Sequence, residues 1–209
     1  MKERSEESVE QPGKKRKGRR RGVGDAEVDR QRPASCWDCG AASRPPGGRL
    51  QVQGHGTRPR GLQGPRKPKG PPQTWDVVVR RYICVVCDVT MSVFPPGVLP
   101  RRRYGATAIA YALALSGLEE LSHQAVRDAV GVHGGARAPA EQQRWASLVR
   151  WSRAARDGLL LDGASRTVGT LRQAAARLAT TIAGYGARIG DLILRVWEGA
   201  LEAPWRGTS

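Results

Sequence analysis

Two short cysteine motifs decide the fold of this 209-residue chain: Cys36-Trp-Asp-Cys39 and Cys84-Val-Val-Cys87. They contain all four cysteines of the sequence and are separated by 44 residues. Each Cys-x-x-Cys motif can turn two thiolates onto one centre, and two such turns complete a tetrahedral four-thiolate site. We therefore predict a structural Zn²⁺ on Cys36, Cys39, Cys84 and Cys87. A disulfide or redox pair and a catalytic metal are weaker alternatives, because a catalytic metal needs an open coordination position.

Strand-like segments flank both cysteine motifs. Residues 75–83 are rich in β-branched side chains and run straight into the second motif, residues 49–53 form a shorter candidate, and residues 89–94 alternate before a Pro-Pro-Gly stop. Residues 45–74 are rich in Gly, Pro and basic side chains and are predicted to form a long loop. The expectation is a small antiparallel zinc ribbon over residues 36–104, in which the metal supplies folding free energy on the order of 10 kcal/mol.

The second half of the chain loses the β pattern and becomes rich in Ala, Leu and Arg. Helices are predicted over residues 106–115, 121–130, 140–155, 167–183 and 188–201, with Ser122 as the N-cap candidate of the second. The predicted fold class is α+β: a zinc ribbon followed by an all-helical domain, with helix-turn-helix-like helices in 105–156 and C-terminal helices in 157–209.

Charge is distributed unevenly. The formal net charge is +16, and residues 36–104 carry +9 of it from twelve basic and three acidic side chains. Residues 1–34 carry a basic run but almost no apolar side chains, so we predict a disordered basic tail there. An anionic partner is expected, and the search for its contacts starts in the middle third.

Several function classes lack their sequence signatures. No apolar run of about 18 residues and no secretory leader are visible, which predicts a cytoplasmic, nucleoid-associated protein without a membrane partner. No phosphate-binding loop, nucleophile elbow or zinc-protease motif is present, and the carboxylates after residue 104 lie in helical sequence. We expect a protein that is not an enzyme and has no small-molecule substrate.

The segment 80–104 (RRYICVVCDVTMSVFPPGVLPRRRY) resembles a bacterial family of zinc-ribbon proteins related to the N-terminal DNA-binding regions of transposases. That family carries the pattern RRYrCxxCxxtfxvlPxxLlPrrrY, and Cys-x-x-Cys-Gly and Gly-His-Gly-x-Arg at 54–58 match it as well. The resemblance covers about residues 36–156. It implies metal-ligand roles for the four cysteines, a helix-turn-helix after the ribbon, and DNA binding. The Gly-rich stretch 133–139 departs from the pattern, since it is longer than the usual turn of about 3–4 residues.

Candidate contacts to double-stranded DNA fall in two groups. Arginines within and just after the ribbon are expected to hold phosphates, and Gln and Arg side chains on the helix over 140–155 are expected to read base edges. For that helix, contact with phosphates alone and a merely solvated basic face are the alternatives. The candidates are Arg80, Arg81, Arg101, Arg102, Arg103, Gln142, Gln143, Arg144 and Arg150.

Two other functions remain open. An RNA-binding or ribosome-associated zinc ribbon predicts exposed aromatics among basic residues on strands, for which Trp75 and Tyr82 are the candidates. A protein-interaction adaptor predicts a homodimer through the helices in 167–201, whose apolar faces exceed what a solvated helix needs.

Overall fold

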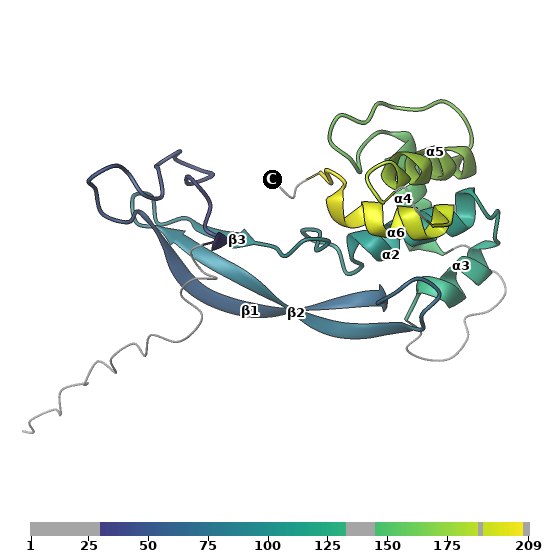
Figure 1. Ribbon diagram of the computed structural model, residues 1–209, viewed down its shortest axis with the longest axis horizontal. Coiled ribbons are helices and arrows are strands. Elements are labelled where there is room, and N and C mark those ends of the chain that lie inside the picture. Colours follow the sequence, from purple (N-terminus) through teal and green to yellow (C-terminus); the bar gives the residue numbers. More distant parts are fainter. Residues whose placement is uncertain (1–29, 133–144, 188–189, 207–209) are drawn as a thin grey trace, which may run out of the picture.

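The structure is a computed structural model that describes residues 30–132, 145–187 and 190–206. Within these residues the chain forms three strands followed by five helices, which confirms the predicted α+β class. In Figure 1 a long two-stranded hairpin extends from the cysteine motifs to a compact helical unit. The elements are β1 (Val52–Pro65), β2 (Pro72–Cys84), β3 (Thr90–Val93), α2 (Ala106–Gly117), α3 (His123–Val130), α4 (Ala146–Arg156), α5 (Leu171–Ala183) and α6 (Leu192–Glu202).

The sheet is antiparallel with strand order β1-β2-β3. β2 and β3 match the strands predicted over 75–83 and 89–94. The predicted loop over 45–74 is wrong for most of its length, because β1 pairs with β2 from Val52 opposite Cys84 to Pro65 opposite Pro72. A β-bulge between Gly54 and Thr57 interrupts this register.

β1 tolerates its glycines and prolines because it lies at the edge of the sheet. Proline has no N–H to donate and is accepted on edge strands, where one row of backbone groups has no strand beside it. The β-branched run of β2 supplies the strand propensity for the pair. Local composition therefore predicted a loop, whereas the long-range pairing makes a strand.

The prediction of a disordered tail over residues 1–34 is wrong for its last five residues. The Arg32 guanidinium donates a hydrogen bond of 2.7 Å to the carbonyl of Val52 and lies 6.0 Å from the centre of the Tyr82 ring. Pro33 accepts a hydrogen bond from the Ser43 hydroxyl. Residues 30–34 are therefore packed on the folded region around the two cysteine motifs, which we call the cysteine unit. The rest of the predicted tail, residues 1–29, lies outside the described residues.

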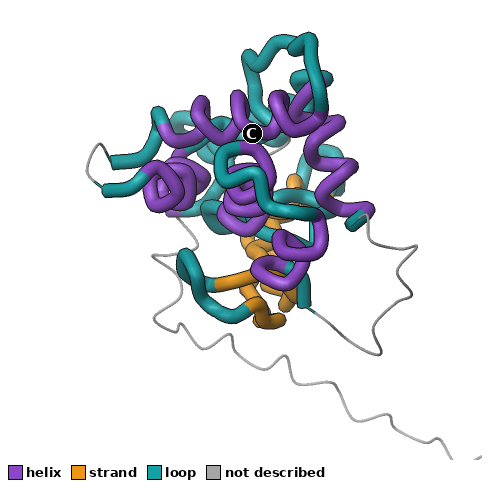
Figure 2. The backbone as a smooth tube through the Cα atoms, turned by 90° about the vertical axis from the view of Figure 1, so that its right-hand side faces the viewer, coloured by secondary structure: helices purple, strands orange, loops and turns teal. Residues whose placement is uncertain are grey.

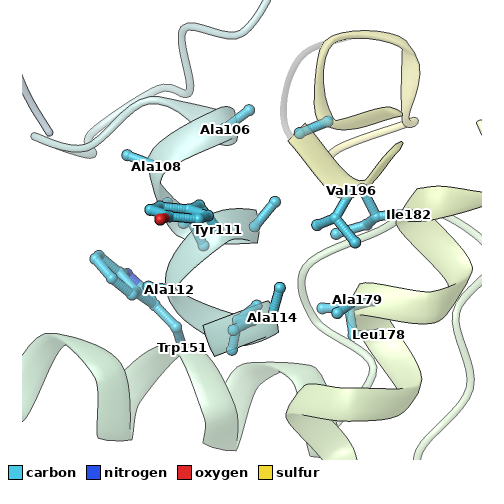
Figure 3. Packing of buried hydrophobic residues seen from close by; sticks show 14 of the residues in the cluster. Ala106, Ala108, Tyr111, Ala112, Ala114, Trp151, Leu178, Ala179, Ile182 and Val196 are labelled. Atoms are coloured by element: carbon cyan, nitrogen blue, oxygen red, sulfur yellow. The ribbon is translucent and has the colours of Figure 1, made fainter. Parts of the chain in front are cut away.

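α2 is the central helix of the helical unit. Its sequence, ATAIAYALALSG, is apolar on every side, and it is surrounded by α3, α4, α5 and α6. Figure 3 shows small side chains such as Ala114 facing Leu178 and Ala179 of α5. The close approach is visible at Gly117, where an added Cβ would lie 2.3 Å from the backbone nitrogen of Ala176. Alanines and this glycine let the helices pack tightly around α2.

Three of the remaining helices, α3, α5 and α6, begin at polar caps, whereas α4 begins after Trp145 without a side-chain cap. Ser122, the predicted N-cap, accepts a hydrogen bond of 3.2 Å from the N–H of Ala125. Thr170 and Gln173 form a reciprocal capping box at the start of α5, and Asp191 caps α6. The apolar faces of α5 and α6 are buried against α2 in the same chain. Leu192 and Leu201 of α6 nevertheless stay exposed, and the homodimer stays a prediction.

The end of the hairpin that carries the turn between β1 and β2 contacts the helical unit. The Gln63 N–H donates to the Arg103 carbonyl at 2.8 Å, and Gln63 forms a parallel β-bridge with Tyr104, just before α2. An added Cβ on Gly64 would lie 2.6 Å from the Cβ of Ala108, so this position has room only for glycine. Figure 2 shows the strands beneath the helices in the perpendicular view. The hairpin therefore links the cysteine unit to the helical core.

The helix-turn-helix stays a prediction. α3 packs against α2 and the hairpin, and α4 packs against α2 and α5. The predicted recognition helix over 140–155 corresponds to α4, which begins at Ala146, and residues 133–144 lie outside the described residues.

Candidate metal centre and arginine cleft

The fold brings the four cysteines together. Their sulfur atoms all lie within 4.8 Å of one another, and the four thiols are free. The Sγ–Sγ distance is 3.7 Å both for Cys36 with Cys87 and for Cys39 with Cys84. A tetrahedron with metal–sulfur bonds of about 2.3 Å has edges of about 3.8 Å, so the spacing is the one a four-thiolate metal site requires. Among the described residues, these four cysteines are the one group of His, Cys, Asp or Glu side chains found close enough together to share a metal ion.

The two cysteine motifs fold into matching backbone turns, the first over residues 36–41 and the second over residues 84–89. In each, the N–H of the first cysteine donates to the carbonyl five residues later, at 2.8 Å in the first turn and 3.0 Å in the second. The N–H four residues later donates back, at 3.0 Å and 2.9 Å. The residue after the second cysteine, Gly40 or Asp88, adopts a left-handed φ of 72° or 57°. The two Cys turns therefore present their thiols in the same way.

Backbone N–H groups favour the thiolate form of Cys36. The N–H groups of Cys39 and Asp38 point at the sulfur of Cys36 and lower its pKa to about 7. At Cys87 the Val89 N–H lowers the pKa, but burial and the neighbouring thiols outweigh it and raise the pKa to about 12. Crowding thus opposes additional negative charges, so four thiolates at this centre require a cation among them.

The apolar core around the cysteines is small. Val52, Tyr82 and Met91 are its buried members besides Cys36 and Cys84, and it is separate from the helical core. Each such side chain contributes about 1.5–3 kcal/mol on burial, whereas ordering a residue costs about 1–2 kcal/mol in backbone entropy alone. Three side chains cannot order this unit, which therefore depends on a further source of stability.

A second candidate site is a cleft between the segment that follows β3 and helix α4. The three arginines at 101–103 and Arg150 of α4 line one cleft of about 360 Å³, together with Tyr104, Ser147 and Trp151. Of the nine DNA contacts predicted from the sequence, the fold brings these four together. We call this site the arginine cleft. Its wall contains no acidic side chain among the described residues.

No acidic side chain among the described residues neutralises the charges in the arginine cleft. Burial, and next the positive charge of Arg150, lower the pKa of Arg102, which places the two guanidinium groups close enough to repel each other. Arg150 donates a long hydrogen bond of 3.4 Å to the Ser147 hydroxyl. Within the part of the chain that the structure describes, neither arginine forms an ion pair with a carboxylate. An anion between them would relieve this repulsion.

The backbone of residues 101–103 is held in place on both sides. The Arg60 guanidinium of β1 donates to the carbonyls of Leu99 and Arg102 at 2.7 and 2.6 Å, and it lies 5.1 Å from the centre of the Phe94 ring. Tyr104 packs edge to face on Trp145 and Trp151 of the α4 segment. The carbonyls are therefore used by the fold, and the arginine side chains remain available to a ligand.

The other predicted DNA contacts lie elsewhere. Arg80 and Arg81 are half-buried in β2, opposite Val93 and Ser92 of β3, and they do not line the arginine cleft. Gln142, Gln143 and Arg144 lie outside the described residues.

Sequence reasoning missed a second, larger cleft of about 760 Å³ beside the first Cys turn. Trp37, Phe94, Arg58 and Arg101 are among its lining residues, and Trp37 is 57% exposed. A signal for Trp37 existed in the sequence, because the middle residues of a Cys-x-x-Cys turn point away from the centre that the cysteines face. Tyr82, singled out as an exposed aromatic, is instead fully buried under the cysteines.

Comparison of the chain with family models, with curated proteins and with solved structures finds no match. Among the described residues, no helix is both long enough and apolar enough to cross a membrane.

Proposed function

We propose that this chain is a zinc-dependent DNA-binding protein that holds the phosphate backbone of duplex DNA in the arginine cleft. The observation that carries the proposal is the convergence of Arg102 and Arg150, from segments 48 residues apart, in a cleft without a carboxylate. Two guanidinium groups that line one cleft favour a phosphate, which can accept hydrogen bonds from both and neutralise their repulsion.

The metal in this proposal is zinc, in a zinc ribbon built from the two Cys turns. Four soft thiolate ligands in a tetrahedral arrangement favour Zn²⁺ over harder divalent cations. Since four protein ligands leave no open position, the ion is structural. Its part is to hold the open end of the hairpin together. Farther along β1, Arg60 fixes the carbonyl of Arg102.

The resemblance to transposase N-terminal regions supports DNA as the nucleic acid. The segment that carries this resemblance, residues 80–104, contains the second Cys turn, β3 and three of the four arginines of the cleft. We propose a transposase-related regulator or remnant that acts in the cytoplasm on the nucleoid.

The experiment is a salt titration of duplex DNA binding. Replacing Arg101, Arg102 and Arg103 by alanine removes three phosphate contacts, so the slope of log affinity against log salt flattens by about 2.7, at roughly 0.9 per contact. The matched control replaces Arg166, Arg172 and Arg177, which are exposed in the helical unit and outside the cleft. It removes the same charge and leaves the slope near that of the wild type. Equal effects of the two triple variants would show that only net charge matters and contradict the proposal.

A further inference from the structure

The cleft beside the first Cys turn combines an exposed aromatic with cationic walls. Trp37 projects from the turn with more than half of its surface exposed, and Arg58 of β1 and Arg101 are exposed on the same cleft. Its volume of about 760 Å³ falls within the range of about 300–1,000 Å³ typical of ligand sites. We call this site the tryptophan cleft.

One wall of the tryptophan cleft is already built and rigid. The Arg60 guanidinium lies over the Phe94 ring at 5.1 Å and is held by two carbonyl hydrogen bonds, so this pair forms a fixed surface. Trp37 has no ring partner among the described aromatic contacts, and its indole face is available. A planar ligand can therefore stack on Trp37 without displacing an internal contact.

The two clefts share one residue. Arg101 lines both the tryptophan cleft and the arginine cleft, and it stands in the segment that connects β3 to α2. Figure 1 shows this segment running from the cysteine end to the helices. A polyanion held by Arg102 and Arg150 can thus continue past Arg101 toward Trp37 without leaving the basic surface.

We propose that the tryptophan cleft holds unpaired nucleotides of DNA next to a duplex held in the arginine cleft. A base stacks on Trp37 and the flanking phosphates lie on Arg58 and Arg101, which is the pairing of aromatic and cationic groups that single strands require. Asp38, the acidic residue of the wall, repels phosphate but accepts a hydrogen bond from a base amino group. This inference rests on the proposed function, because the duplex side of the junction is the arginine cleft.

The test compares three DNA probes by fluorescence anisotropy: a blunt duplex, the same duplex with a four-thymidine overhang, and that overhang built from abasic residues. The wild-type chain is expected to bind the thymidine overhang at least about fivefold more tightly than the blunt duplex, the gain of one stacked base. The abasic overhang keeps its phosphates and loses most of this gain.

Variants locate the stacking residue. Trp37→Ala removes the overhang gain and leaves blunt-duplex affinity unchanged, whereas Trp37→Phe retains most of the gain. Val85→Ala is the matched control, because Val85 holds the equivalent position in the second Cys turn, is also exposed, and does not line the cleft. Zinc content near one equivalent in each variant shows that the Cys turns are intact.

The outcomes separate this inference from the proposed function. An overhang gain that is absent, or that survives Trp37→Ala, overturns the inference while blunt-duplex binding still supports the arginine cleft. In Arg102→Ala, a weaker affinity for the blunt duplex, together with an unchanged ratio of overhang affinity to blunt-duplex affinity, supports each site independently. A ribonucleotide overhang bound more tightly than the thymidine overhang would overturn the assignment of the cleft to DNA.

Discussion

The Tyr104 ring packs edge to face on the Trp151 indole with ring centres 5.1 Å apart, and this contact holds residues 101–103 against α4. Trp145 completes the group, with its ring centre 5.7 Å from that of Tyr104 and 5.2 Å from that of Trp151. The three rings join the end of the segment between β3 and α2 to the helix that carries Arg150. The arginine cleft therefore depends on an aromatic contact as much as on charge.

Tyr104→Leu is expected to destabilise the chain and to weaken DNA binding. Leucine keeps an apolar side chain but loses two edge-to-face contacts, each contributing about 0.5–1.5 kcal/mol beyond its buried area. Thermal unfolding and duplex affinity measure the two effects. Tyr104→Phe keeps both ring contacts and serves as the control; a phenylalanine variant as weak as the leucine variant would contradict the packing argument.

Cys84→Ser is expected to lower the bound zinc well below one equivalent and to unfold residues 36–100. The helical signal in circular dichroism should persist, because the helical core is separate from the small core around the cysteines. Elemental analysis and circular dichroism provide the two measurements. His55→Ala, an exposed position outside the cysteine cluster, should retain the metal. Full zinc content in the serine variant would show that the cysteines do not hold the ion.

Arg101 adopts a left-handed φ of 56°, which is strained for a residue with a side chain. Arg101→Gly is therefore expected to be more stable than Arg101→Ala by about 1 kcal/mol, since glycine adopts this conformation freely. Both variants lose the same charge and should lose the same DNA affinity. Denaturant unfolding and anisotropy compare them. Equal stability of the two variants would mean that the backbone at this position carries no strain.

Arg150→Ala is expected to change stability and binding in opposite directions. Removing Arg150 relieves the repulsion on Arg102, so the stability of the free protein rises slightly at low salt. The DNA complex loses a charge-assisted hydrogen bond of about 1.5–3 kcal/mol, which weakens duplex binding by at least tenfold. Arg153→Ala, exposed on the same helix and outside the cleft, should leave the affinity within about twofold. A loss of stability in Arg150→Ala would argue for a structural role.

Base reading by the segment before α4 remains a prediction from the sequence. If Gln143 and Arg144 reach base edges, each contributes about 1–3 kcal/mol of discrimination at one base pair. A selection from random duplexes with wild type and Arg144→Ala should show a preference that relaxes at one position. Trp145→Ala should cost stability without changing the motif, because Trp145 packs against the helical core. A wild type that enriches no motif would make the chain a non-specific DNA binder.

Some features could be derived from the sequence because they are local. The Cys-x-x-Cys spacing brings two thiols to one turn whatever surrounds it, and the four sulfur atoms do meet. Ser122 was predicted as an N-cap and is one, since a cap depends on the next three residues alone. The β-branched run before Cys84 forms the central strand, as its propensity indicated.

Other features were decided by contacts between distant residues. The Gly- and Pro-rich stretch became β1 because β2 offers it a partner and the sheet edge tolerates prolines, neither of which composition reveals. The apolar faces of the last two helices pack on α2, which their sequences alone do not reveal.

The arginine cleft shows the same division most clearly. The sequence by itself determined the four-cysteine centre and a basic middle third, because charge and the spacing of ligand residues can be read directly from the sequence. Only the tertiary structure decided that Arg102 and Arg150 line the same cleft and that Arg80 and Arg81 lie outside it. Tyr104 and Trp151 bring those two segments together by burying their rings, and burial depends on the whole packed core rather than on neighbours along the chain.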